Sequence, residues 1–194
     1  GGLKIDYLSG MIHGHTSGGG IIVENSTENI DLETSGGGII AKECNGKIRL
    51  HTSGGGLILE NLKGNIDAHT SGGGIEGNNI EGELVTSTSG GGIILKDMNC
   101  SLDASTSAGS LIAQMKHVGK YLKLNTNAGN IELELPLKQG LDLDLRGGKV
   151  NQHPSTISDF SGDWSKDQVK GSVNGGGIPV TADASNGNLN VKFN

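Results

Sequence analysis

The stretch HTSGGGIIVEN, residues 15–25, contains the phrase that decides the fold, Thr-Ser-Gly-Gly-Gly followed by an aliphatic residue. Copies of TSGGG recur with a constant 18-residue step, at Thr16, Thr34, Thr52, Thr70 and Thr88. A degenerate copy, TSAGS, begins in phase at Thr106, and a more distant one, TNAGN, begins at Thr126 after a two-residue insertion. Self-similarity at a fixed period of this kind is typical of stacked repeat architectures.

A weaker nine-residue period lies inside the 18-residue period. Aliphatic residues recur at this spacing, at Ile21, Ile30, Ile39, Ile48, Leu57, Ile66, Ile75, Leu84, Ile93, Leu102 and Leu111. After Ile66, the inward-type residues Ala68 and Thr70 alternate with Asp67 and His69, as in a strand with one buried face. Each 18-residue unit therefore contains two short strands joined by two turns.

Stacking these units in parallel explains both periods, because each strand then pairs with its counterpart in the next unit. A half-unit of nine residues is too short for a helical crossover. The sequence therefore predicts an all-β fold, a right-handed parallel β-solenoid with 18-residue coils and two short strands per coil. We expect the glycine triplet to permit a tight corner where coils pass close together, including positive φ.

Two other solenoid classes fit less well. Hexapeptide left-handed helices also have 18-residue coils, but their aliphatic residues recur every six residues instead of every nine. Calcium-binding β-rolls use nine residues, yet their glycine repeat carries an Asp that is absent from this chain.

The chain is expected to form one domain with two parts. Regular coils cover residues 1–135, and residues 136–194 form the last degenerate coils and an irregular C-terminal cap. Three of the five aromatic residues, Phe160, Trp164 and Phe193, lie in the last 35 residues. Because the ends of a solenoid must be covered, we expect these three to plug the C-terminal end of the core.

Composition excludes several classes of protein. The chain has 35 Gly but only 3 Pro and no triplet period, so it is not collagen-like. A net charge of −6 without a basic run argues against a nucleic-acid partner, and no apolar segment is long enough to span a bilayer. Residues from Gly1 onward are already in phase with the repeat, so we expect a fragment of a longer protein whose targeting region lies upstream.

The two cysteines, Cys44 and Cys100, lie about three coils apart, which corresponds to about 14 Å along the axis. A disulfide requires Cα atoms within about 7 Å, so no bond between them is expected. Cys44 falls on an inward position and is expected to act as a small apolar residue.

The TSGGG units and the ending KGSVNGGGIPVTADASNGNLNVKF, residues 170–193, resemble an adhesin-like bacterial family of glycine-rich β-solenoid domains in exported proteins. The resemblance covers essentially the whole chain. It implies an extracytoplasmic location, at the cell surface or in the periplasm, and a protein without established catalysis.

Equivalent outward residues of a solenoid form columns along its axis, and two polar columns are candidate binding surfaces. The first contains His15, Glu33, His51 and His69. Three imidazoles with a carboxylate could bind a transition metal, but a solvated polar ladder is the favoured interpretation. The second contains Asp31, Arg49 and Asp67. The two aspartates, about 9.6 Å apart, have the spacing of an inverting glycosidase, although charge compensation by Arg49 is favoured.

An aliphatic column on the other sheet is the third candidate surface. It contains Ile22, Ile40, Ile58, Ile94 and Ile112, interrupted by Glu76. A large exposed apolar patch meets a partner or is covered. We expect either the C-terminal segment, another chain or a ligand on it. The threonines of the repeat are expected to point inward at the corner, unlike the flat exposed array of an ice-binding solenoid.

No P-loop, nucleophile elbow or zinc spacing occurs, so no cofactor and no metal are expected. The sequence favours a noncatalytic, extracytoplasmic β-solenoid, an adhesin or cell-envelope scaffold that presents an extended surface to a protein or polysaccharide. A polysaccharide-active enzyme using Asp31 and Asp67 is the first alternative, and a purely structural spacer is the second.

Overall fold

The chain forms a continuous stack of β-strands, which the computed structural model describes for residues 1–152 and 159–194. Within these residues every regular element is a strand, and no helix occurs. The strands are β1 (Leu3–Asp6), β2 (Ser9–Thr16), β3 (Ile21–Glu24), β4 (Thr27–Thr34), β5 (Ile39–Lys42), β6 (Asn45–Thr52), β7 (Leu57–Thr70), β8 (Ile75–Thr88), β9 (Ile93–Thr106), β10 (Leu111–Thr126), β11 (Ile131–Leu135), β12 (Leu141–Gln152), β13 (Phe160–Trp164), β14 (Gln168–Val173) and β15 (Ile178–Phe193).

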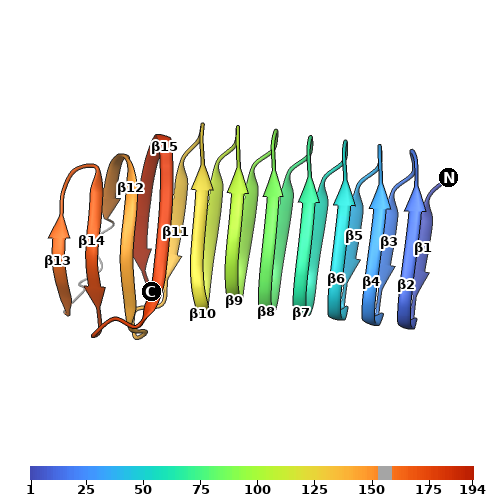
Figure 1. The fold of residues 1–194 in the computed structure, drawn as a ribbon, viewed down its shortest axis with the longest axis horizontal. Coiled ribbons are helices and arrows are strands. Elements are labelled where there is room, and N and C mark those ends of the chain that lie inside the picture. The colour runs from blue at the N-terminus through green and yellow to red at the C-terminus, as the bar shows by residue number, and fades with distance from the viewer. Residues whose placement is uncertain (153–158) are drawn as a thin grey trace.

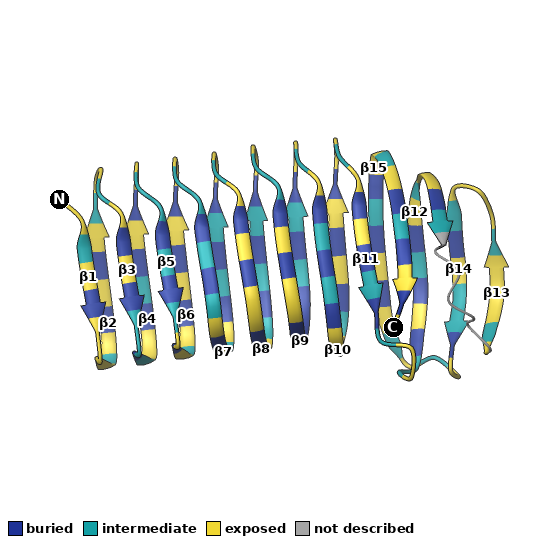
Figure 2. Ribbon diagram, turned by 180° about the vertical axis from the view of Figure 1, so that it is seen from behind, coloured by how far each residue is buried: buried dark blue, intermediate teal, exposed yellow. Residues whose placement is uncertain are grey.

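Parallel pairing between equivalent residues of successive repeats joins the strands. Ile21 pairs with Ile39, and Ile30 pairs with Ile48. About seven coils stack along one axis (Figure 1). Figures 1 and 2 show the stack from opposite sides, and the nearer strands run upward in Figure 1 and downward in Figure 2, as in a right-handed coil. The predicted right-handed parallel β-solenoid is confirmed.

Each coil contributes to two faces of the stack. The Ile face consists of β1, β3, β5, β11 and the first halves of β7 to β10, and the His face consists of β2, β4, β6 and the second halves of β7 to β10. Buried and exposed residues alternate along the strands of both faces (Figure 2). The inward side chains of Ile39, Leu50 and Leu59 have no exposed surface. The core is thus a thin aliphatic layer between the two faces.

The first corner of each coil is built by the threonine of TSGGG. Its side-chain oxygen donates a hydrogen bond to the carbonyl of the middle glycine one coil earlier, at 2.7–3.0 Å in all seven copies from Thr16 to Thr126. The same oxygen accepts a bond from the next middle glycine, as from the N–H of Gly55 to Thr52. From Thr34 onward these threonines are buried, as predicted.

The glycines of the first corner differ from the expectation in one respect. Positive φ values occur at other glycines, and none of the TSGGG glycines has one. Close approach is the reason for glycine here, because a Cβ on Gly55 would lie 2.3 Å from the carbonyl oxygen of Gly37. The middle glycine is therefore required by contact between coils and not by backbone conformation.

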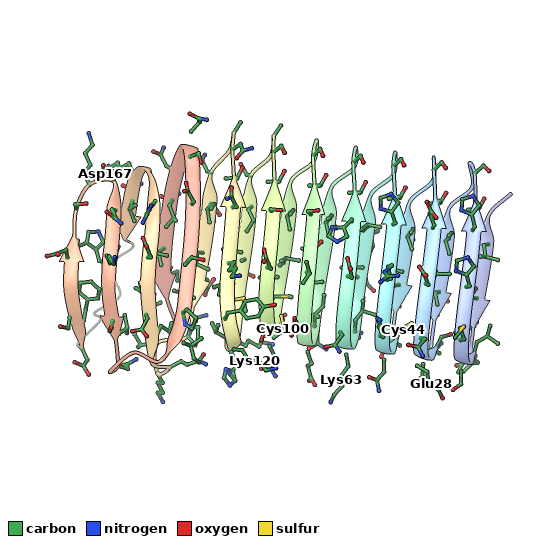
Figure 3. The ribbon with its side chains drawn as sticks, in the orientation of Figure 1. Glu28, Cys44, Lys63, Cys100, Lys120 and Asp167 are labelled. Carbon is green, nitrogen blue, oxygen red and sulfur yellow. The ribbon has the colours of Figure 1, made fainter. Side chains whose placement is uncertain are left out.

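Positive φ is found at the second corner, where two columns adopt it. The first column consists of Tyr7, Asn25, Glu43, Asn61, Asn79 and Asp97, with φ between 49° and 55°. The second consists of Gly10, Glu28, Gly46, Gly64 and Gly82. Asparagine and glycine tolerate this region best. Glu28, at φ 84°, is the exception in the glycine column and lies at the corner edge of the stack (Figure 3).

The C-terminal part changes the order of the strands. β15 pairs on one side with β10 and β11 and on the other side with β12, so the last strand of the chain lies between strands that precede it (Figure 1). Beyond β12, strands β14 and β13 pair antiparallel. An antiparallel pair therefore ends the stack on the His face.

Two of the three C-terminal aromatic residues lie at this end. Phe160 and Trp164 on β13 pack edge to face, with ring centroids 5.7 Å apart, against the end of the core. Phe193 on β15 pairs with Leu135 of β11 and is buried inside the stack. The expectation that all three plug the end is thus met by Phe160 and Trp164 alone.

Candidate functional site

The first polar column runs straight along the His face. Consecutive strands pair His15 with Glu33, Glu33 with His51, and His51 with His69, and Ser87, Ser105 and Asn125 continue the column. His15 Nδ1 lies 3.7 Å from Glu33 Oε2, with both side chains about half exposed. Among residues 1–152 and 159–194, no three His, Cys, Asp or Glu side chains are grouped so that they could hold a metal ion.

The second polar column lies beside the first and carries alternating charge. Asp31 Oδ2 is 3.7 Å from His13 Nδ1 and 3.8 Å from Arg49 Nη1. Asp67 lies against His69 Nε2 on its own strand. Arg49 therefore compensates the charge of Asp31, while Asp67 contacts a histidine of the neighbouring column without a hydrogen bond to its Oδ1. Each aspartate has a cationic or polar partner on its own coil or on the next one.

His69 contacts side chains of both polar columns, a link that the sequence did not predict. Its Nδ1 is 2.6 Å from Ser87 Oγ on the next coil, and its Nε2 contacts Asp67. Serine, histidine and aspartate in contact resemble the side chains of a nucleophilic triad. Such a triad also needs free N–H donors for an oxyanion. Because β8 is hydrogen-bonded to β7 and to β9, the backbone at Ser87 is occupied by the sheet.

The isoleucine column on the Ile face is a partly exposed stripe, in which Ile40, Ile58 and Ile112 are half-buried. Ile22, Ile40 and Ile58 stand in register on β3, β5 and β7, and Ile94 and Ile112 follow on β9 and β10 after Glu76. Ile22 and Ile94 are both 36% exposed. We call this column, with Lys4 before it and Glu76 within it, the Ile stripe.

A groove runs along the N-terminal part of the Ile stripe, with a volume of about 720 Å³. Its floor is the row of third glycines, including Gly20, Gly38 and Gly56, which have no side chains to fill it. All of the residues that line it lie between Gly2 and Glu76. The described C-terminal segment therefore does not cover this part of the stripe.

Both thiols are buried and unpaired. Cys44 and Cys100 are free cysteines in the core, as their separation predicted. Burial raises the pKa of the Cys100 thiol to about 12 and also raises the pKa of Cys44. At neutral pH neither is a thiolate, so the folded chain presents neither as a nucleophile.

Two carboxyl groups with lowered pKa values lie at the C-terminal end. The pKa of Asp142 is lowered, first by the Ser172 hydroxyl at 2.6 Å and then by the Gly177 N–H at 2.9 Å. The pKa of Asp144 is lowered chiefly by hydrogen bonds from Arg146. Asp142 ties the turn before β15 to β12 and β14, a structural role that no sequence pattern indicated.

One further contact on the His face involves a tyrosine. The hydroxyl of Tyr121 donates to Glu83 at 3.0 Å across two coils, and desolvation together with this carboxylate raises the pKa of Tyr121 to about 12. Tyr121 lies within the irregular pairing of β10 between Val118 and Leu122, where the 18-residue period is interrupted. The contact could not be predicted from the repeat for that reason.

The chain was compared with known proteins. Residues 46–192 match the family described as Toastrack DUF4097, a β-solenoid-like domain of unknown function. No curated protein matches, and no solved structure matches. No helix in the described part of the chain is long and apolar enough to cross a membrane. Since the match covers more than half of its length, this chain belongs to the Toastrack DUF4097 family.

Proposed function

We propose that the protein is a noncatalytic, extracytoplasmic β-solenoid that acts as an adhesin or cell-envelope scaffold by presenting an extended binding surface. The observation that carries this proposal is the Ile stripe. Isoleucine side chains stand in register along the outside of the stack, and Ile22 and Ile94 are 36% exposed. Contiguous exposed apolar surface marks an interaction site in soluble proteins.

The arrangement of the polar columns argues against catalysis. Their side chains stand on a sheet whose backbone groups are used in strand pairing, and Asp31 and Asp67 are each held by a neighbour. Catalysis requires groups that converge on one reacting atom. The Ile stripe, in contrast, repeats the same side chain at intervals of about 4.8 Å, which suits a long ligand that makes similar contacts on successive coils.

The stripe also distinguishes a binding protein from a structural spacer. A spacer requires inward residues that pack and outward residues that are soluble. Isoleucine in an outward column meets neither need, and Glu76 in the same column indicates that the fold accepts a charged residue there. The apolar character of the column is therefore available for function.

Ile94→Glu tests the proposal, with Ser105→Glu as its matched control. Both substitutions introduce the same charge on β9, on opposite faces, and each column already holds a glutamate, at Glu76 and Glu33 respectively. Purified chains are probed with a glycan array and with purified envelope polysaccharides. We expect wild type and Ser105→Glu to bind alike and Ile94→Glu to bind about tenfold more weakly.

Equal binding by all three folded chains, or binding by none, would remove the Ile stripe as the ligand surface.

Incubating the polysaccharides with the protein and measuring new reducing ends tests the enzyme alternative, with Asp67→Asn as its control. Fractionation of source cells with an antibody against the chain tests the extracytoplasmic location.

A further inference from the structure

The N-terminal part of the Ile stripe has a charge pattern that is complementary to itself. Along five successive rungs the outward residues are Lys4, Ile22, Ile40, Ile58 and Glu76. Ile40 is the middle rung, and the cation and the carboxylate each stand two rungs from it. The groove of about 720 Å³ runs along these five rungs, with a glycine floor and Lys4 and Glu76 at its ends.

Glu76 has no side-chain partner among the residues that the structure describes. Its side chain is exposed between Ile58 and Ile94 of the same column, and it forms no ion pair within residues 1–152 and 159–194. Lys4 Nζ has only a 3.7 Å contact with Glu24, and its side chain is 65% exposed. Each end of the groove therefore offers a charge that a docking partner can neutralise.

We propose that the partner of this part of the Ile stripe is a second copy of the chain. The inference rests on the proposed function, since it names the first occupant of the same stripe. A two-fold axis that lies between the facing sheets at Ile40, parallel to the strands, brings the two stacks together in opposite axial directions. Lys4 of each copy then faces Glu76 of the other, Ile22 faces Ile58, and the two Ile40 side chains meet at the axis.

Within the stripe, Lys4 and Glu76 favour one orientation. An axis parallel to the stack would keep both copies in the same axial direction and place the Lys4 side chains at the same end, and like charges oppose that arrangement. The opposed arrangement pairs Lys4 with Glu76 at both ends of the stripe, and in the neighbouring outward column it places Glu24 opposite Glu60 and the two Lys42 side chains opposite each other. It is an isologous contact, which closes at two copies.

The area of the contact predicts its strength. Five rungs at about 4.8 Å and five residues at about 3.3 Å give a patch of about 24 Å by about 17 Å. This lies below the standard of about 800 Å² per partner, in the range of transient complexes. We expect a dimer that dissociates in the micromolar range and whose affinity falls as salt screens the two ion pairs.

Reversing the charge at Lys4 or Glu76 tests contacts between two chains, because the two residues cannot contact each other within one chain. Lys4 and Glu76 are four rungs apart, about 19 Å, so they cannot touch in the monomer. Lys4→Glu alone and Glu76→Lys alone each place like charges at both ends of the dimer. We expect each variant to associate more than tenfold more weakly than wild type.

The two variants are complementary to one another. In a mixture, the carboxylate introduced at position 4 of one chain faces the ammonium introduced at position 76 of the other. The native Glu76 of the first chain then faces the native Lys4 of the second. Sedimentation velocity of each variant, of their equimolar mixture and of the double variant that carries both substitutions is measured up to about 500 µM. We expect the mixture and the double variant to recover the wild-type dimer.

Ile22→Glu and Ile94→Glu form the matched apolar pair. Both residues are 36% exposed in the same column, but in a dimer of the chain of residues 1–194 only Ile22 lies inside the overlap. We expect Ile22→Glu to abolish the dimer and Ile94→Glu to keep it. A wild-type chain that stays monomeric at the highest concentration, or a mixture that associates no better than its components, overturns the inference.

The same variants separate this inference from the proposed function. If Lys4→Glu is monomeric yet binds polysaccharide as wild type does, the dimer and the ligand surface are independent and both proposals stand. A monomeric wild type whose ligand binding is lost in Ile94→Glu refutes only the dimer. A dimer in which Ile94→Glu and wild type fail equally to bind any glycan refutes only the proposed function.

Discussion

At the residue scale, one glycine in each triplet decides whether two coils can stack. A Cβ on the middle glycine Gly55 would lie 2.3 Å from the Gly37 carbonyl oxygen, and that oxygen belongs to backbone that cannot move aside. The degenerate copies of the phrase agree with this geometry. TSAGS and TNAGN replace the first and third glycines, with Ala108 and Asn130 for example, but keep the middle one as Gly109 and Gly129.

The first prediction compares two glycines of one triplet. Gly55→Ala should lower the free energy of unfolding by about 3 kcal/mol, because the coil must move away from its neighbour. Gly54→Ala should cost less than about 1 kcal/mol, since alanine already occupies this column at Ala108 and Ala128. Urea denaturation of both variants measures the difference. Equal losses would mean that backbone freedom, and not contact between coils, explains the triplet.

The second prediction concerns the one glutamate in the glycine column of the second corner. Glu28 has φ 84°, a conformation that costs a side chain with a Cβ about 1 kcal/mol or more. Glu28→Gly should therefore raise the free energy of unfolding by about 1 kcal/mol, although it removes the exposed bond from Ser9. Gly46→Ala at the next rung should do the opposite, because its Cβ would lie 2.2 Å from the Glu28 carbonyl oxygen. Urea denaturation measures both, and a destabilised Glu28→Gly variant would contradict this account of the corner.

At the scale of the structural element, the first corner is held by a ladder of threonine hydroxyls. Thr52 Oγ1 donates to Gly37 O at 2.7 Å and accepts from the Gly55 N–H at 3.3 Å, and its side chain is buried. Thr52→Val keeps the shape but leaves two partly buried backbone groups, the Gly37 carbonyl and the Gly55 N–H, without this partner. We expect a loss of about 2 kcal/mol in thermal or urea unfolding. Ser53→Ala, at the exposed neighbour, is the control and should change stability by less than about 0.5 kcal/mol.

The C-terminal elements depend on a carboxylate, which makes their stability pH-dependent. The pKa of Asp142 is lowered by the Ser172 hydroxyl and the Gly177 N–H. A lowered folded-state pKa stabilises the fold above the ordinary carboxyl value, and this contribution is lost as pH falls through the folded pKa. Asp142→Ala should therefore melt below wild type at neutral pH, with the gap closing as the pH falls below the ordinary aspartate range. A gap of constant size in thermal melts across that range would show that the side chain acts by packing alone.

The sequence predicts the regular coils well and the C-terminal elements poorly, for a physical reason. In the coils each residue pairs with its equivalent in the next repeat, so the period of the chain is the register of the sheet. After Leu135 the pairing partners are no longer at that distance, as with Leu141 and Ile178. The insertion of β15 and the turn held by Asp142 depend on such distant pairs, which leave no periodic signal. The columns were predictable for the same reason as the coils, whereas the contact of His69 with Asp67 and Ser87 depends on side-chain rotamers.

At the scale of the whole molecule, the two ends of the stack differ. The antiparallel pair β14 and β13 with Phe160 and Trp164 covers one end, whereas β1 and β2 each have a hydrogen-bonded neighbour on one side only. In the isolated chain of residues 1–194, whose coils contact only their neighbours, we expect unfolding to begin at the less covered end. The exposed Tyr7 and Met11 on the first coil also contribute little burial there.

The two native cysteines report on this asymmetry. Cys44 lies in the third coil and Cys100 in the sixth, both are buried, and both have raised pKa values, so neither reacts in the folded state (Figure 3). We expect Cys44 to react with a thiol reagent at lower urea concentration than Cys100, because the coils near β1 separate first. Labelling at low protein concentration, where the dimer is absent, with Cys100→Ala and Cys44→Ala to assign each signal, measures the two midpoints. Coincident midpoints would instead require the stack to unfold as a single cooperative unit, with coupling between rungs strong enough to reach across at least three coils.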